Sequence, residues 1–313
     1  MFNSDNKKYE SNINALLNSI VELNKELLVL ENSQVIRKNI MIKNFKKHFR
    51  AKNFKHILNR IRVRRNISKL PIDSKKDQKH DLEKNNYFST ERIAVYSVLF
   101  GNYDCINEPV FQPDNCDFYI ITDQEIPPNS HWNKLDISFL ESKIHYFNNI
   151  EKNRFFKMRP DLLFSDYKYS IYLDSNILVV GDLTAMVNKI GRSGMAFHAH
   201  RHRNCVYSEA KAAEMLNKID KKTEKKFYSY LKNLNIPKHI GLAECNIIAR
   251  QHSNALCLKA MNEWWEEFIN GDVKRDQLYL PIALKKCSIK VDEVTTLGTN
   301  VYENPLVRVL FHN

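Results

Sequence analysis

Hydrophobic residues recur at three- and four-residue steps along residues 9–33. The apolar stripe is made of Ile13, Leu16, Leu17, Ile20, Leu23, Leu27 and Leu30, with Glu and Lys residues between them. This spacing follows one face of an α-helix, so we expect a helix here. The stripe covers only about three heptads, which suits either a coiled coil that joins two copies of the chain or a helix that packs back on the rest of the protein.

Residues 34–66 combine apolar and cationic positions at helical spacing. Ile42, Phe45 and Phe49 belong to the apolar set, and residues 37–65 contain twelve Lys or Arg and no Asp or Glu. One apolar face and one cationic face is typical of a helix that lies on an anionic membrane surface. A solvated helix that covers the core fits the same pattern. A nucleic-acid-binding arm is unlikely because no recognised binding motif accompanies the charge.

Downstream of residue 90, short apolar runs alternate with amphipathic stretches. Residues 67–90 are polar and include Pro71, as in a linker, so we expect a helical basic extension over 1–66, a linker over 67–90 and a main domain over 91–313. In the main domain we expect strands at 93–100, 117–122, 169–174, 195–200, 246–249 and 288–294. Helices are expected at 150–164, with a kink or first turn at Pro160, and at 208–219, 222–233, 253–269 and 276–286.

This alternation predicts an α/β fold with a Rossmann-like, mostly parallel central sheet and helices on both faces, preceded by the α-helical N-terminal extension. In such sheets, ligands bind beyond the carboxyl ends of the strands. Trp264, Trp265 and Phe268 lie in the amphipathic stretch 253–269, where we expect them to be core residues rather than a platform for a sugar ring.

The charge of the chain is concentrated at its front. The formal net charge is +12, yet outside residues 37–65 the 36 remaining basic residues balance 36 acidic ones. No apolar stretch approaches the ~20 residues that a membrane-spanning helix needs, and the first residues do not resemble a signal peptide. We therefore expect a cytoplasmic protein at the inner face of the cell membrane. None of the six cysteines forms a C-x-x-C pair, which suits reduced, mostly buried thiols.

Several enzyme classes are disfavoured by missing motifs. The chain has only seven glycines and lacks the P-loop, the dinucleotide-binding G-x-G-x-x-G and the nucleophile-elbow G-x-S-x-G patterns. A P-loop ATPase, a dinucleotide-dependent dehydrogenase and a serine hydrolase of the elbow type are therefore poor interpretations.

Asp174 and Asn176 directly follow an expected buried strand. Their oxygens are hard ligands of the kind that a divalent cation prefers, and a cation here would neutralise a departing diphosphate. The same residues are common in turns that have no function, so the pair alone is a weak signal.

Three histidines alternate with other residues at His198, His200 and His202. On an extended strand all three side chains would share one face, which would allow a zinc site. Arg201 and Arg203 lie between and after them, and this favours an anion-binding strip instead.

Residues 92–313 resemble the GT-A glycosyltransferases, and within them the domain-of-unknown-function 616 family of plant wall and bacterial polysaccharide proteins. The resemblance rests on six segments in the same order: 95–104 (VYSVLFGNYD), 154–160 (RFFKMRP), 171–176 (IYLDSN), 200–210 (HRHRNCVYSEA), 241–246 (GLAECN) and 275–277 (RDQ). It implies a GT-A fold and transfer of a sugar from a nucleotide-diphosphate donor.

The resemblance also implies roles for individual residues. Those expected at the donor nucleotide and sugar are Phe100, Gly101, Tyr103, Asp104, Thr122, Asp123, Arg154, Lys157, Asp174 and Ser175. Asp174 and Asn176 stand at the family's metal-binding Asp-x-Asp motif, and His312 at a metal- or phosphate-binding histidine, so Mn²⁺ or Mg²⁺ is the implied cofactor. The second acid of the motif is replaced by Asn176, which makes a metal-independent reaction possible.

At the acceptor side the resemblance implies the acidic residues Glu244 and Asp276, with Asp276 as the preferred general base if the reaction inverts. His200, Arg203 and Asn246 are expected at the acceptor or a phosphate. Each assignment has a simpler alternative: Arg154 and Lys157 suit a solvated helix face, Asp276 suits a helix cap, and His312 suits a mobile tail.

Together these features predict a nucleotide-sugar-dependent hexosyltransferase whose acceptor is a surface polysaccharide, of the capsule or lipopolysaccharide type, or a lipid-linked glycan. Residues 37–65 would bind the anionic membrane surface, and residues 9–33 would form a homodimer. The alternative is a non-catalytic scaffold that binds a glycan or nucleotide within a polysaccharide assembly complex. The two differ in whether a nucleotide sugar is consumed.

Overall fold

The structure is a computed structural model that describes residues 2–31, 33, 69–73, 88–102 and 104–310. The basic stretch 37–65, Tyr103 and His312 lie outside these residues, so the expectations placed on them stay predictions.

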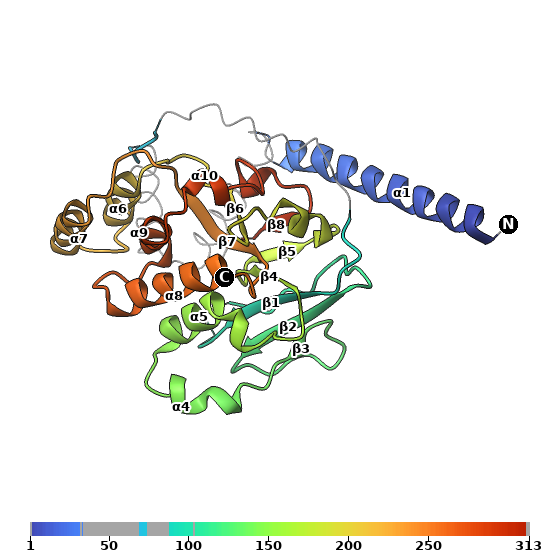
Figure 1. Cartoon of the computed structure of the whole chain (residues 1–313), viewed down its shortest axis with the longest axis horizontal. Coiled ribbons are helices and arrows are strands. Elements are labelled where there is room, and N and C mark those ends of the chain that lie inside the picture. The colour runs from blue at the N-terminus through green and yellow to red at the C-terminus, as the bar shows by residue number, and fades with distance from the viewer. Residues whose placement is uncertain (1, 32, 34–68, 74–87, 103, 311–313) are drawn as a thin grey trace, which may run out of the picture.

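Within the described residues, six strands form a central sheet in the order β3-β2-β1-β4-β7-β6 (Figure 1). Strands β1 (Ile93–Leu99), β2 (Cys116–Thr122), β3 (Asn133–Lys134) and β4 (Tyr169–Leu173) are parallel, whereas β7 (Ala243–Arg250) runs antiparallel to both β4 and β6 (Met195–Ala199). Five strands thus share one direction, which confirms the mostly parallel sheet. Because Leu99 pairs with Thr122 and Ser97 with Leu173, the carboxyl ends of β1, β2 and β4 meet at one edge.

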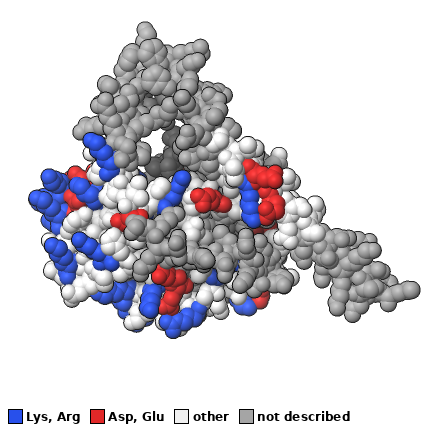
Figure 2. Space-filling view, turned by 90° about the horizontal axis from the view of Figure 1, so that it is seen from above, with Lys and Arg blue, Asp and Glu red and all other residues white. Residues whose placement is uncertain are grey.

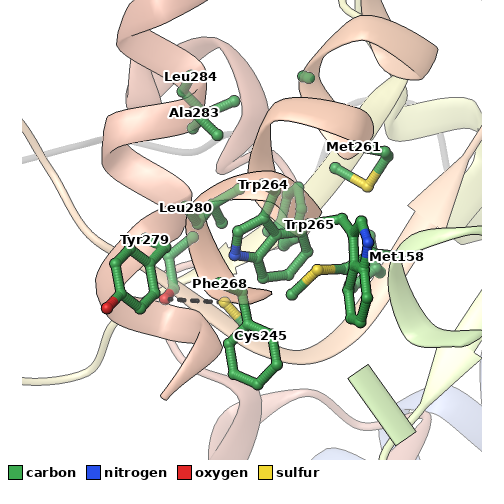
Figure 3. Packing of buried hydrophobic residues seen from close by; sticks show 14 of the residues in the cluster. Met158, Cys245, Met261, Trp264, Trp265, Phe268, Tyr279, Leu280, Ala283 and Leu284 are labelled. Atoms are coloured by element: carbon green, nitrogen blue, oxygen red, sulfur yellow. Dashed lines mark hydrogen bonds between the residues drawn. The ribbon is translucent and has the colours of Figure 1, made fainter. Parts of the chain in front are cut away.

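One face of the sheet is covered by helices α5 (Asn149–Met158), α8 (Ala255–Asn270) and α9 (Asp276–Lys286), with α6 (Val206–Met215) and α7 (Lys221–Asn233) beside α9. The aromatic residues of α8 fill this layer, since Trp264, Trp265 and Phe268 are buried with the sheet residue Cys245 (Figure 3). Their core role is confirmed. The Trp264 indole also donates a hydrogen bond of 2.8 Å to the carbonyl oxygen of Asp276, which fixes the first residue of α9.

The other face is covered by a 3-10 helix, Leu183–Lys189, and by a two-stranded antiparallel sheet of β5 (Ile177–Val179) and β8 (Val307–Val309). Helix α1 (Phe2–Glu31) confirms the helix expected at 9–33, and its second half contacts this small sheet. Arg308 donates to the carbonyl oxygen of Asn24 at 3.2 Å, and Val21 and Leu28 of the same helix are buried.

Two local expectations change in the structure. The strand expected at 288–294 is wrong: Val291–Val294 forms the short helix α10, because Val291 and Val294 are three residues apart and bury the same helix side while Asp292 stays exposed. The helix expected at 150–164 ends at Met158, and Pro160 begins a separate 3-10 turn, as its missing N–H allows. A short helix, α4 (Glu141–Ile144), precedes α5.

All six cysteines are free thiols, and five of them are buried, as expected. Among the helices in the described part of the chain, none is both long and apolar enough to cross a membrane.

Candidate active site

The turns after β1 and β2 are tied together at the carboxyl edge of the sheet. The backbone N–H of Gly101 donates to both carboxylate oxygens of Asp123, at 3.0 and 3.1 Å. Gly101 has a φ of +75°, and a Cβ at this position would come within 2.2 Å of the Asn149 amide at the start of α5. A side chain here would therefore push α5 away from the edge of the sheet.

The turn after β4 is linked to the same edge. The Ser175 hydroxyl lies 3.3 Å from a carboxylate oxygen of the buried Asp104, and Asn107 donates to the carbonyl oxygen of Ser175 at 2.8 Å. The expected donor-site residues on the three strands, apart from Tyr103, are thus brought together. They come from turns that lie up to 71 residues apart in sequence.

Beside these turns lies a group of four charges that we call the charged cluster: Arg154, Lys157, Asp174 and Asp276. The Lys157 ammonium is 2.7 Å from an Asp276 carboxylate oxygen and 3.3 Å from one of Asp174. The Arg154 Nε is 3.2 Å from the other Asp276 oxygen. The side chain of Lys157 is only 1% exposed, whereas that of Asp174 is 32% exposed. The two cations therefore do not lie on a solvated helix face, and Asp174 opens the cluster to a ligand.

Asp276 is held ionised by its neighbours. Burial would raise the pKa of this carboxyl, but the nearby Arg154 and Lys157 outweigh burial and hold the pKa well below its usual range. Asp276 is the first residue of α9, and Arg275 occupies the cap position. The alternative of Asp276 as the cap is therefore wrong, and such an acidic carboxyl is poorly suited to accept a proton near neutral pH.

Lys157 is oriented by residues beneath it. The Tyr172 hydroxyl donates to Asp174 at 2.7 Å, and the Lys157 ammonium lies 4.9 Å from the centre of the Tyr172 ring. The carbonyl oxygen of Lys157 accepts hydrogen bonds from the Tyr96 hydroxyl, at 3.1 Å, and from the fully buried Arg250, at 2.7 Å. Arg250 also donates to the Tyr96 hydroxyl. These hydrogen bonds fix the last turn of α5, which carries Lys157.

A second group of charges borders the cluster on the side of β6 and β7. Glu244 of β7 lies 3.5 Å from the His200 ring, which follows β6. Arg203 forms an ion pair of 2.5 Å with Glu209 of α6, and Arg275 contacts the other oxygen of Glu209 at 3.4 Å. Burial, followed by the negative charge of Glu209, raises the pKa of Glu244 to about 7. Glu244 is thus poised to exchange a proton near neutral pH.

Tyr172, Glu209 and Arg275 were not among the residues that the sequence marked as functional. Each lies close to a marked residue in sequence or in one of the six segments, but nothing in the sequence places Glu209 between two arginines. That arrangement depends on how α6 packs against the start of α9.

Four buried polar atoms of this charged region have no aligned hydrogen-bond partner in the described part of the chain. They are the Nε atoms of Arg154 and Arg275, the Oδ1 atom of Asn246 and the Oδ2 atom of Asp276, which lies 2.7 Å from the Lys157 ammonium. The Arg154 Nε contacts Asp276 as an ion pair without hydrogen-bond alignment. Buried polar groups are rarely left unsatisfied, so two donors and two acceptors in this region suit the binding of a polar ligand.

Of the three expected metal ligands, Asp174 and Asn176 lie in the described part of the chain and His312 lies outside it. Asn176 donates to the carbonyl oxygen of Leu310 at 3.1 Å, which holds the chain end near Asp174. The described residues contain no group of three His, Cys, Asp or Glu that could hold a metal, and one Asp174 oxygen already contacts Lys157 and Tyr172. The described part alone does not complete a metal site, so Mn²⁺ or Mg²⁺ stays a prediction.

The three alternating histidines do not form a common site. A bulge interrupts the pairing of β6 at Phe197 and His198, and the buried His198 ring contacts Asn304 at 2.8 Å. The His200 ring faces Glu244 and Glu209 instead, and His202 lies past the end of the strand. The shared face expected from the alternation is therefore wrong, and the zinc interpretation has no support.

Comparison with known proteins places the chain in a family. Two solved glycosyltransferases show remote structural similarity. WbbM, a bifunctional glycosyltransferase in its apo form, has a TM-score of 0.42 and 12% identity over 68% of this chain and 40% of its own. The galactosyltransferase LgtC, in complex with donor and acceptor sugar analogues, has a TM-score of 0.37 and 11% identity over 61% of this chain and 70% of its own.

The chain thus spans less than half the length of WbbM. No curated protein matches it by sequence. The model of the TOD1/MUCI70 glycosyltransferase-like domain matches residues 31–312, and its description does not carry the name domain-of-unknown-function 616. Because that match includes the charged cluster and almost the whole chain, this protein belongs to the TOD1/MUCI70 family of glycosyltransferase-like domains.

Proposed function

We propose that this protein transfers a hexose from a nucleoside-diphosphate sugar to a hydroxyl group of a surface polysaccharide or a lipid-linked glycan. The observation that carries the proposal is the charged cluster at the carboxyl edge of the sheet, with unsatisfied arginine donors on one side and Glu244 on the other. Cations that bind a diphosphate and a base of near-neutral pKa are the two groups that this reaction needs.

The nucleotide would lie against the turns after β1 and β2. Phe100, Gly101 and Asp104 come from the first turn, and Thr122 and Asp123 from the second. Asp123 already accepts two hydrogen bonds from Gly101, so its first task is to shape the turn that receives the base or ribose. The diphosphate would then reach the charged cluster.

The departing diphosphate would be stabilised by Arg154, Lys157 and Arg275. The Nε donors of Arg154 and Arg275, which lack an aligned hydrogen-bond partner in the described residues, would donate to phosphate oxygens, and the buried ammonium of Lys157 would add a fixed positive charge. Asp276 keeps Arg154 and Lys157 in position before the donor arrives. In this role Asp276 orients cations, and the general base is a different carboxylate.

Glu244 replaces Asp276 as our choice of general base. In the inverting route the acceptor oxygen attacks the anomeric carbon, its proton passes to Glu244, and the bond to the diphosphate breaks with its electron pair on the leaving oxygen. A pKa of about 7 lets Glu244 be ionised at neutral pH and still accept the proton. The neighbouring His200 and Arg203 would orient the acceptor, with Asn246 offering its unsatisfied oxygen.

A divalent cation, Mn²⁺ or Mg²⁺, would supply additional charge neutralisation of the diphosphate at Asp174, Asn176 and His312. Asp174 has the exposure that such a role needs. The binding test below therefore includes the metal as a variable.

Binding of the donor is tested by thermal unfolding of the full chain with a panel of nucleoside diphosphates and nucleotide sugars, with and without Mn²⁺. A ligand at 100 times its Kd adds about 2.7 kcal/mol to the free energy of unfolding, which raises Tm measurably. We expect one nucleotide class to stabilise the wild type and to lose this effect in Asp174→Asn. The exposed Asp166→Asn is the matched control, and it should respond as the wild type does.

The same experiment, combined with an assay for consumption of the nucleotide sugar, distinguishes the enzyme from the non-catalytic scaffold. A folded wild type that no nucleotide stabilises, with or without Mn²⁺, contradicts the donor site. Stabilisation without any consumption of a nucleotide sugar supports a binding module instead of an enzyme.

A further inference from the structure

A cavity of about 730 Å³ lies beside the edge strand β6, outside the charged cluster. It is bounded by residues 199–204 after β6, by residues 237–242 before β7, and by the end of α9 with the following residues 288–295. This volume is in the range of sites for small molecules. The proposed acceptor site and the cavity share two residues, His200 and Arg203.

Aliphatic residues form part of the cavity wall. Its described lining includes Pro237, Ile240, Leu242, Pro281, Ile289 and Val291. No Trp, Tyr or Phe is among the lining residues that the structure describes, so a sugar ring would find no flat aromatic face there. A hydrocarbon chain fits such walls better than a glycan does, because burying it removes apolar surface from water on both sides.

The lining also carries exposed basic side chains. Lys285, Lys290, His202 and His239 are all exposed. The Lys285 ammonium is fixed near the end of α7, where it donates to the carbonyl oxygens of Leu234, at 2.9 Å, and Asn235. Both of these partners are neutral carbonyl groups, so neither of them offsets the positive charge of the lysine.

Two carboxylates also line the cavity, but the oxygens of Asp73 are hydrogen-bonded to other protein groups. Its oxygens accept hydrogen bonds from the Asn204 backbone at 3.0 Å and from the Ser208 hydroxyl at 2.9 Å. The backbone N–H of Asp73 donates in turn to His202 at 3.0 Å. Asp73 thus holds residues 69–73 against the cavity wall. The second carboxylate, Asp292, belongs to a lining with more basic groups than acidic ones.

We infer that this cavity binds the lipid phosphate of a lipid-linked acceptor: its hydrocarbon chain against the aliphatic walls and its phosphate at Lys285 and Lys290. The inference rests on the proposed function and narrows its acceptor class from two to one. His200 joins the two sites, since it lines the cavity and its ring lies 3.5 Å from the Glu244 carboxylate. A sugar attached to the bound phosphate would extend past His200 to the general base.

The inference is tested by titrating farnesyl phosphate into the full chain, with farnesol and inorganic phosphate as matched ligands. We expect farnesyl phosphate to bind at least tenfold more tightly than either one, because each lacks half of the recognised chemistry. Lys290→Gln should weaken binding about fivefold, as expected for one cation near a phosphate. Lys259→Gln, an exposed lysine of α8 outside the cavity, should leave it unchanged.

A second variant tests the aliphatic walls. Thr299 lines the cavity and is partly exposed, so Thr299→Trp fills the space without removing a core contact. It should abolish binding of farnesyl phosphate while nucleotide-dependent stabilisation persists, which shows that the variant is folded. Equal binding by wild type and Thr299→Trp would overturn the site.

Other results are also decisive. An uncharged oligosaccharide that binds the wild type and not Thr299→Trp, in place of farnesyl phosphate, would assign the cavity to a glycan and overturn the inference. If the protein binds farnesyl phosphate but no nucleotide stabilises it, the lipid-phosphate site is supported and the proposed glycosyltransferase function is contradicted. The two proposals therefore fail separately.

Discussion

Lys157 shows at the scale of one residue why the site needs its surroundings. A buried ammonium costs several kcal/mol unless it is paired, and here two carboxylates lie within 3.3 Å of it. Arg250 is buried as well, and the partners that the structure gives it are a carbonyl oxygen, a hydroxyl and a thioether. Both cations therefore hold their positions through neighbours on other strands and helices, and these neighbours are testable.

Tyr96→Phe should loosen the last turn of α5. The hydroxyl donates to the carbonyl oxygens of Phe156 and Lys157 and accepts from Arg250, and all of these groups are buried. Removing it leaves an arginine donor unsatisfied, which should lower the free energy of unfolding by about 1–3 kcal/mol. Urea denaturation measures the loss. Tyr146→Phe, on an 85% exposed residue, is the control, and an equal effect in both would refute the role of Tyr96.

Glu244→Gln should stabilise the protein at alkaline pH. Burial raises the pKa of Glu244 from 4.5 to about 7, so the folded state binds more protons than the unfolded state between these values. Stability from this group is therefore present at pH 4.5 and is lost as pH rises through 7. Glutamine escapes the loss, and at pH 8 the variant should gain up to about 3 kcal/mol over the wild type.

Thermal unfolding at pH 4.5 and pH 8 tests this expectation, with the exposed Glu125→Gln as control. A gain that is the same at both pH values would mean that Glu244 titrates normally.

At the scale of elements, helix α1 has two different apolar faces. Val21 and Leu28 are buried, whereas Leu16, Leu23 and Leu27 are 64%, 64% and 47% exposed. The exposed leucines, with Leu30, follow one another at steps of seven, four and three residues, which is the spacing of a coiled-coil seam. Packing on the main domain therefore leaves a second apolar side of the helix for the predicted pairing with a second copy.

The double variant Leu23→Glu, Leu27→Glu should convert a dimer to a monomer, because four charges would meet in the seam. Light scattering of the full chain measures the molar mass. Val29→Glu changes an exposed residue on another side of α1 and should remain dimeric. A wild type that is monomeric at high concentration contradicts the coiled coil.

The sequence predicted those elements whose own residues decide their structure. Strands such as β1 are continuously buried and apolar, and the acidic turns behind them marked the edge where Asp174 lies. The pairing of β5 with β8 was missed because it joins segments about 130 residues apart and each strand has only three residues. The run 288–294 was misread because its apolar residues Ile289, Val291 and Val294 are separated by polar ones at steps of two and three, which suit a short strand as well as a single helical turn.

The site was predictable to the same extent. Arg154 and Lys157 are spaced to share a helix face, and in the structure both of their side chains contact Asp276. Their partner Asp276 is 119 residues beyond Lys157, and its lowered pKa follows from that contact. The resemblance to the glycosyltransferases favoured Asp276 as the base because the sequence does not show this contact. The raised pKa of Glu244 was not predictable either, since it depends on burial and on Glu209 of α6.

At the scale of the molecule, Lys and Arg side chains are concentrated in two regions. Figure 2 shows Lys and Arg side chains gathered over one end of the described surface, where α7 contributes the exposed Lys221, Lys222, Lys225 and Lys226. The twelve cations of residues 37–65 form the second region and lie outside the described residues. We expect the second region to bind anionic membranes because apolar residues accompany its cations.

Replacing Lys46, Lys47, Lys52 and Lys55 with Gln should weaken binding to anionic vesicles at least tenfold, since each cation near the surface adds about 1 kcal/mol. The same change at the four α7 lysines is the control and should have a smaller effect. Co-sedimentation with anionic and neutral vesicles measures binding. Equal loss in both variants would indicate unspecific attraction by the whole protein.

The most direct test of the central claim is the release of nucleoside diphosphate from nucleotide sugars by the wild type and Glu244→Gln over pH 5–9. We predict that the wild type consumes one donor class, with a rate that rises to half its maximum near pH 7 as Glu244 ionises. Glu244→Gln should lower the rate by at least 100-fold, as expected for loss of a general base. A folded wild type that consumes no nucleotide sugar, or a variant with the wild-type rate and pH profile, would contradict the account.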